Sequence, residues 1–177
     1  MTSARPRVTG DRRTRGGILA EQANAPLRVM TSESSWRCRR SYAGKPAQVR
    51  HARAFLAEVL EGCPRVDDTV LLISELCANA VLHSNSRKPG GLFTVHAEVH
   101  EGEYIWAEVA DCGGLWATME GCVGERGHGL DIVREIASDW GRDGDPVTGW
   151  VVWFRLDWPA IDVGSGTKVA RNGQQAS

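Results

Sequence analysis

The stretch that most constrains the fold is residues 70–82, in which ten of thirteen residues are apolar. The apolar residues occupy every side of a 3.6-residue helical wheel, which predicts a helix buried inside a domain. Among the polar exceptions, Glu75 and Asn79 lie four residues apart and share one helix face, and His83 extends the same row by one turn. Because burying an unpaired carboxylate or amide is costly, we expect Glu75 and Asn79 to meet a partner or a ligand.

The length and charge of the chain limit what it can be. A chain of 177 residues can form one domain with a substantial core, flanked by tails. The net charge of −1, from 21 basic and 22 acidic residues, argues against direct binding to nucleic acid, which needs a basic surface. No apolar run approaches the ~20 residues of a membrane helix, and the N-terminus lacks the apolar centre of a signal peptide. We therefore expect a cytoplasmic protein, not associated with a membrane, whose partners are proteins or small molecules.

The cysteines support the same location. They are odd in number, widely spaced and never arranged as Cys-x-x-Cys, which favours reduced thiols over disulfides or a zinc site. The five positions are Cys38, Cys63, Cys77, Cys112 and Cys122.

The hydrophobic patterns predict one α/β domain over residues 34–158. Residues 1–33 and 159–177 lack sustained periodicity, so we expect a disordered arm and a disordered tail. The fold class we expect is a two-layer α/β sandwich, with about three helices on one face of a mixed, largely antiparallel sheet. The expected elements, in chain order, are a strand at 35–42, helices at 47–60 and 70–82, a hairpin of strands at 92–100 and 104–109, a loop at 112–126 long enough to be a lid, a helix at 127–137, a turn-rich connection at 139–146 with room for a short strand around Trp140, and a strand at 150–158.

Two further features point to a ligand. The alternation of the strand at 104–109 places Asp111 on the face of Ile105 and Val109, so its carboxylate should project towards the core without an evident protein partner. Gly127 and Gly129 stand at the start of the last helix, where small residues let backbone N–H groups approach an anion closely.

Three signals therefore follow one another: Glu75-x-x-x-Asn79 on a helix, Asp111-Cys112-Gly113-Gly114 after a strand, and Gly127-His128-Gly129-Leu130 at a helix start. Their ordered combination resembles the Bergerat-fold superfamily of ATP-binding proteins, which includes gyrase-type ATPases and histidine kinases. More narrowly, it is similar to bacterial anti-sigma factors that are also serine protein kinases. The resemblance implies ATP and Mg²⁺ as cofactors, a sigma factor and an anti-anti-sigma protein of the STAS type as partners, and a homodimer.

The resemblance and the chemistry of the side chains together suggest a role for each residue. Asn79 offers a neutral oxygen to Mg²⁺, and Glu75 can act as the general base that prepares the attacking hydroxyl group. Asp111 can accept a hydrogen bond from the exocyclic amine of adenine, and Arg126 is the basic residue of the loop that precedes the last helix. The expected nucleotide-binding set is Asn79, His83, Asp111, Gly113, Gly114, Arg126, Gly127, His128, Gly129 and Leu130.

One alternative function stays open at this stage. The protein could be a nucleotide-dependent switch for protein binding in which no phosphate is transferred. A histidine kinase is disfavoured, because His51 lacks the acidic neighbour and the helical hairpin of such phosphoacceptors. A gyrase-like or chaperone-like machine is disfavoured too, since the chain offers no second domain to drive.

Overall fold

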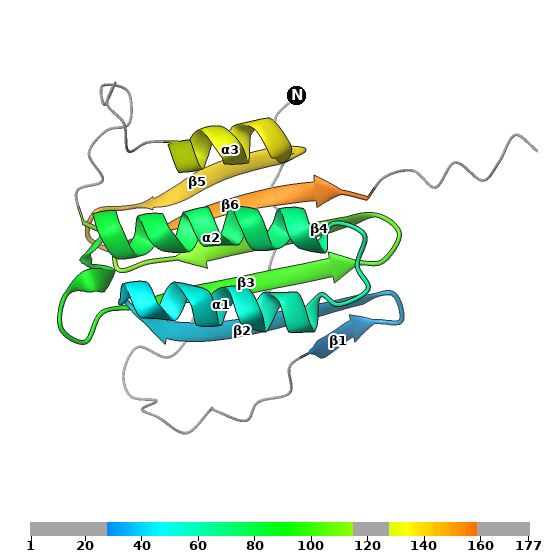
Figure 1. The fold of residues 1–177 in the computed structure, drawn as a ribbon, viewed down its shortest axis with the longest axis horizontal. Coiled ribbons are helices and arrows are strands. Elements are labelled where there is room, and N and C mark those ends of the chain that lie inside the picture. The colour runs from blue at the N-terminus through cyan, green and yellow to red at the C-terminus, as the bar shows by residue number, and fades with distance from the viewer. Residues whose placement is uncertain (1–27, 115–127, 159–177) are drawn as a thin grey trace, which may run out of the picture.

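The structure is a computed structural model that describes residues 28–114 and 128–158 (Figure 1). Its elements are β1 (Val29–Ser32), β2 (Ser35–Ala43), α1 (Pro46–Val59), α2 (Val66–His83), the short 3₁₀ helix η1 (Asn85–Arg87), β3 (Leu92–His100), β4 (Tyr104–Ala110), α3 (His128–Ile136), β5 (Asp139–Asp145) and β6 (Gly149–Asp157).

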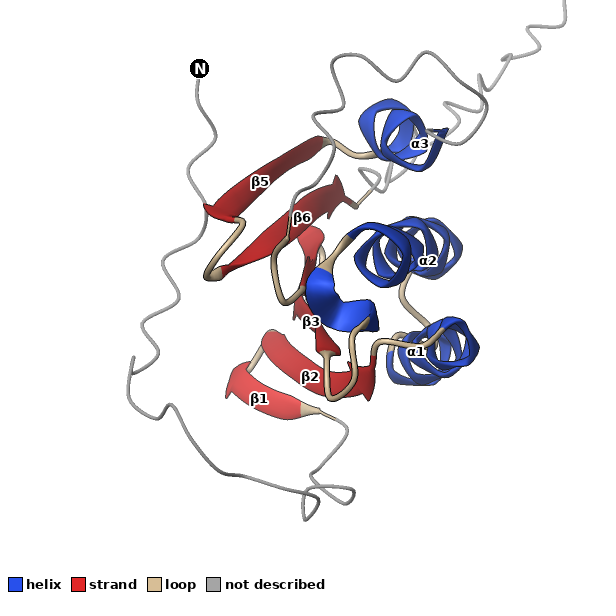
Figure 2. Cartoon of the chain, turned by 90° about the vertical axis from the view of Figure 1, so that its left-hand side faces the viewer, coloured by secondary structure: helices blue, strands red, loops and turns tan. Residues whose placement is uncertain are grey.

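Six strands form one sheet in the order β1-β2-β3-β4-β6-β5, and each neighbouring pair is antiparallel. Helices α1, α2 and α3 lie side by side on one face of this sheet (Figures 1 and 2). The expected two-layer α/β sandwich with three helices on one face is confirmed. No helix in the described part of the chain is long and apolar enough to cross a membrane.

The hairpin of β3 and β4 follows the expected alternation. On β3, Phe93, Val95, Ala97 and Val99 are buried under the helices, and Val99 pairs with Ile105 of β4. The intervening turn contains Gly102 with a φ of 80°, a conformation that glycine adopts without steric cost. Alternation places one apolar row per strand in the core, which fixes the register of the pair.

Helix α2 is less buried than its composition suggested. Leu71 and Leu82 are 42% and 56% exposed, so one side of α2 is open to solvent between α1 and α3. Glu75 and Asn79 are half-buried, although they belong to a helix that was expected to be buried. The apolar composition reflects contacts on three sides, with the sheet and with both flanking helices. The buried residues of α2 are Thr69, Leu72, Ile73, Leu76, Cys77, Ala80 and Val81.

Two strands differ from the expectation. Strand β1 lies within the stretch 1–33 that was expected to be a disordered arm, and its four residues are all exposed. Strand β5 is seven residues long where a turn-rich connection with a short strand was expected. Both are edge strands, and β5 is rich in Asp and Gly, which single-residue preferences disfavour in strands. Pairing with β2 and with β6 supplies the backbone hydrogen bonds that override these local preferences.

Candidate functional site

Helix α3 begins directly beside the polar row of α2. A methyl group at Gly129, the second residue of α3, would lie 2.8 Å from Glu75 Oε2 and 3.5 Å from Asn79 Nδ2. The missing side chain therefore lets the first turn of α3 pack against these two polar groups. The structure brings together two signals that are 50 residues apart in the sequence, the Glu75–Asn79 row and the glycine-rich helix start.

The backbone at the start of α3 can attract an anionic ligand. The first turn of a helix carries N–H groups without intrahelical partners and the positive end of the helix dipole. Neither Glu75 nor Asn79 has a side-chain hydrogen bond or an ion pair with another residue of the described ranges. The amide oxygen of Asn79 is thus open to a cation such as Mg²⁺, and phosphate groups can approach the start of α3.

Asp111 has partners that the sequence did not reveal. It follows β4, and its Oδ1 accepts hydrogen bonds from the backbone N–H of Gly113 at 2.6 Å and of Trp150 at 3.1 Å. The expectation of a core carboxylate without a protein partner is therefore wrong, because β6 runs beside β4 and presents the N–H of its residue 150. These two bonds hold the carboxylate in one place at the end of β4.

The loop after Asp111 requires its glycines. Gly113 has a φ of 73°, and a methyl group there would lie 2.5 Å from the carbonyl oxygen of Pro146. Gly114 has a φ of 105° and packs closely against Asn85. Only glycine combines this backbone conformation with such close neighbours. The two glycines therefore let the loop after Asp111 pack between the end of α2 and the turn before β6.

Helix η1 connects this loop to the end of α2. The N–H of Asn85 donates to the carbonyl of Gly113 at 2.7 Å, and the N–H of Cys112 donates to Ser86 Oγ at 3.1 Å. Ser86 is fully buried, and its hydroxyl group donates in turn to the carbonyl of Leu92 at 2.7 Å. These bonds fix the Asp111 loop relative to the helix that carries Glu75 and Asn79.

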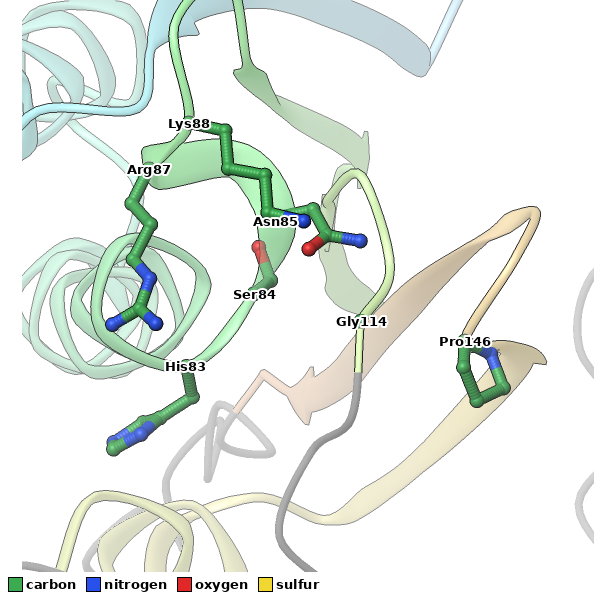
Figure 3. Close-up of a pocket in the computed structure, with 7 residues that line it drawn as sticks. All are labelled: His83, Ser84, Asn85, Arg87, Lys88, Gly114 and Pro146. Carbon is green, nitrogen blue, oxygen red and sulfur yellow. The ribbon is translucent and has the colours of Figure 1, made fainter.

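A pocket of about 400 Å³ opens at this junction (Figure 3). His83 and Gly114 of the expected set line it. Asn79 lies one turn before His83, and Asp111 lies three residues before Gly114, but neither is among the described residues that line the pocket. The described lining residues are His83, Ser84, Asn85, Arg87, Lys88, Gly114 and Pro146.

Five of these lining residues were missed by sequence reasoning. The adjacent basic residues Arg87 and Lys88, placed between a helix end and the turn at Pro89, were the signal that could have found the pocket. The Arg87 guanidinium donates to the carbonyl of Leu82 at 3.4 Å and so helps to cap α2. Ser84 and Pro146 carry no comparable sequence signal.

The remaining expected residues divide into two groups. Arg126 and Gly127 lie outside the described residues, as does most of the expected lid at 112–126. His128 is the first residue of α3, and Leu130 is 7% exposed and belongs to the hydrophobic core, where it anchors α3.

No group of three or more His, Cys, Asp or Glu side chains is arranged to hold a metal ion in residues 28–114 and 128–158. A single amide ligand such as Asn79 still suits Mg²⁺, which usually keeps several waters and takes its other ligands from substrate phosphates. The amide oxygen of Asn79 therefore fits a Mg²⁺ ion that arrives with a nucleotide.

Comparisons with known proteins identify the family of the chain. A family model described as the histidine kinase-like ATPase domain matches residues 42–156, which include α1, α2, α3 and most of the sheet. Among solved structures, the chain is similar to the RsbU and RsbW domains of Rv1364c from Mycobacterium tuberculosis, with 21% identity and a TM-score of 0.51. That match covers 69% of this chain and 33% of the other chain. A comparison with curated proteins finds no match. Because the family model spans well over half of the sequence, this chain belongs to the histidine kinase-like ATPase domain family.

Proposed function

We propose that this protein is an ATP-binding anti-sigma regulatory factor that phosphorylates a serine on an anti-anti-sigma partner. The observation that carries the proposal is the contact of Gly129 with Glu75 and Asn79. It joins a helix start suited to phosphates, an amide oxygen suited to Mg²⁺ and a carboxylate in one place. Membership of the histidine kinase-like ATPase domain family supports the ATP-binding part.

In the proposed reaction, the serine hydroxyl oxygen of the partner attacks the γ-phosphorus of ATP. The bond between the γ-phosphorus and the β–γ bridging oxygen breaks, ADP leaves, and Glu75 accepts the hydroxyl proton. Asn79 would hold Mg²⁺, which neutralises charge on the phosphate oxygens. Arg126, which lies outside the described residues, would supply further positive charge.

Asp111 is proposed to select adenine. Its carboxylate accepts hydrogen bonds, and adenine presents an exocyclic amine where guanine presents a carbonyl oxygen. The backbone N–H groups of Gly113 and Trp150 hold this carboxylate in position. ATP should therefore bind better than GTP, and exchange of the carboxylate for an amide in Asp111→Asn should weaken that preference.

The proposed partners are a sigma factor and an anti-anti-sigma protein of the STAS type, bound by a homodimer in the cytoplasm. The similarity to the structure of the RsbU and RsbW domains of Rv1364c is consistent with this proposal.

Two measurements on the purified protein test the proposal. Isothermal titration with ATP should show binding that depends on Mg²⁺, and the absence of binding by the folded protein would end the proposal. Transfer from γ-labelled ATP to a partner captured from native lysate then tests the chemistry. Binding without transfer would favour the alternative, a nucleotide-dependent switch for protein binding.

Glu75→Gln separates binding from chemistry. This variant should bind Mg²⁺–ATP within about twofold of the wild type, whereas transfer should slow by on the order of 10²- to 10⁴-fold through loss of the general base. Glu58→Gln, on the exposed side of α1, removes the same charge away from the site and serves as the control. Undiminished transfer by Glu75→Gln would refute the role assigned to this carboxylate.

A further inference from the structure

The pocket at the end of α2 is lined by basic side chains. Three of its described lining residues, His83, Arg87 and Lys88, have side chains that can carry positive charge, and no carboxylate is among them. Like charges repel, so the arrangement is stabilised when an anion binds between them. The pocket is open to solvent at these exposed side chains, which gives such an anion access.

Two of these three residues have a structural explanation. His83 stands in the last turn of α2, where the negative end of the helix dipole favours a cation. Arg87 donates to the carbonyl of Leu82 at the same helix end. Helix capping alone accounts for both positions, so neither identifies a ligand without further support.

Lys88 has no such explanation. It follows η1, and its backbone N–H donates to the carbonyl of Asn85 at 3.0 Å. Its ammonium group has no hydrogen bond or ion pair with any other described residue. Figure 3 shows the side chain extending towards Asn85, beside the backbone at Gly114. An ammonium group and a side-chain amide are thus placed at one wall of the pocket, next to the loop that follows Asp111.

The position of the pocket relative to the proposed nucleotide site indicates which anion it binds. The proposed site places adenine at Asp111 and the γ-phosphate near Glu75 and Gly129. The pocket adjoins Gly114 and begins one helical turn beyond Asn79, on the side away from Glu75. A phosphate in this pocket would therefore be close to the adenosine end of the nucleotide.

We propose that Lys88, supported by Asn85, forms a subsite for the α-phosphate of the bound nucleotide. This inference rests on the proposed function, because it takes the adenine and γ-phosphate positions from it. Lys88 would be a binding residue that recognises a group shared by AMP, ADP and ATP. Lys88 would also supply positive charge to the phosphate groups, independently of Arg126.

The test is isothermal titration of wild-type and Lys88→Gln protein with adenosine, AMP, ADP and ATP in the presence of Mg²⁺. The variant should bind the three nucleotides less tightly by the same factor, on the order of 3- to 10-fold, and should bind adenosine as the wild type does. The loss should shrink as the salt concentration rises, because the interaction is between a cation and an anion near the surface. Arg53→Gln, which removes one positive charge from an exposed position of α1, should change none of these affinities.

Several outcomes would overturn the inference. Equal affinities in wild type and Lys88→Gln would show that the ammonium group is only solvated. A loss confined to ATP would place the contact at the γ-phosphate, and a matching loss for adenosine would show an effect on pocket shape instead. Failure of the wild type to bind any nucleotide would contradict the proposed function itself and is thereby distinguishable from failure at Lys88 alone.

Discussion

Gly129→Ala offers a direct test of how α2 and α3 form the site. The added methyl group would lie 2.8 Å from Glu75 Oε2 and 3.3 Å from Glu75 Cβ, so the carboxylate must move away. Moving the end of a flexible side chain costs about 0.5–1.5 kcal/mol, the range for a strained rotamer. Alanine in place of glycine stabilises a helix interior by about 0.5–1 kcal/mol, and less near a helix end. The two effects are of similar size and opposite sign.

The expected result is therefore a folded protein with an impaired reaction. The free energy of unfolding should stay within about 1 kcal/mol of the wild type, which corresponds to a change in Tm of roughly 2–4 °C. Transfer of the γ-phosphate should slow by on the order of 10²- to 10⁴-fold, because the general base is displaced from its place. Thermal denaturation and transfer of labelled phosphate measure the two quantities separately.

A double variant makes the test stricter. If Gly129→Ala acts by displacing Glu75, the combination with Glu75→Gln should be no slower than Glu75→Gln alone, since both remove the same function. Additive losses would show that the methyl group acts through the helix start or through Asn79. A fall in Tm of more than about 8 °C would instead show that the backbone of α3 had shifted.

Two further predictions concern stability. Gly44→Ala would place a methyl group 1.8 Å from the carbonyl oxygen of Ser86, so the backbone must shift, and we expect a loss of at least about 1–3 kcal/mol in urea denaturation; unchanged stability would contradict this close approach. Burial raises the pKa of the Cys38 thiol to about 12. The unfolded thiol loses its proton from about pH 8.5 while the folded thiol keeps it, so stability should fall between these values as the pH rises. Cys38→Ala should reduce that fall in the free energy of unfolding between pH 8 and pH 10. An unchanged pH dependence would show that ionisation of Cys38 does not cause the fall.

Local patterns determined much of this protein. Period-two alternation identified β2, β3, β4 and β6, because the side-chain direction in a strand depends only on residue parity. The spacing of Glu75 and Asn79 predicted a shared helix face for the same local reason. The ordered motifs then indicated the family, which the match over residues 42–156 confirms.

Other features depended on contacts between distant parts of the chain. The edge strands β1 and β5 have weak local preferences and exist through pairing with β2 and β6. The partners of Asp111 include the backbone N–H of Trp150, which becomes a neighbour only when β6 lies beside β4. The pocket with Lys88 combines the end of α2, the loop at Gly114 and the turn at Pro146.

Glu75 and Asn79 illustrate what the sequence determines and what only the tertiary structure determines. Helical periodicity, a property of neighbouring residues, placed the two side chains on one face of α2. It could not show how deeply they are buried, because burial depends on which elements pack against that face. The tertiary structure decided that α3 begins there, with a glycine that leaves room for the carboxylate and the amide at a helix start. Sequence pattern thus determined which groups are available, and long-range packing determined which of them meet.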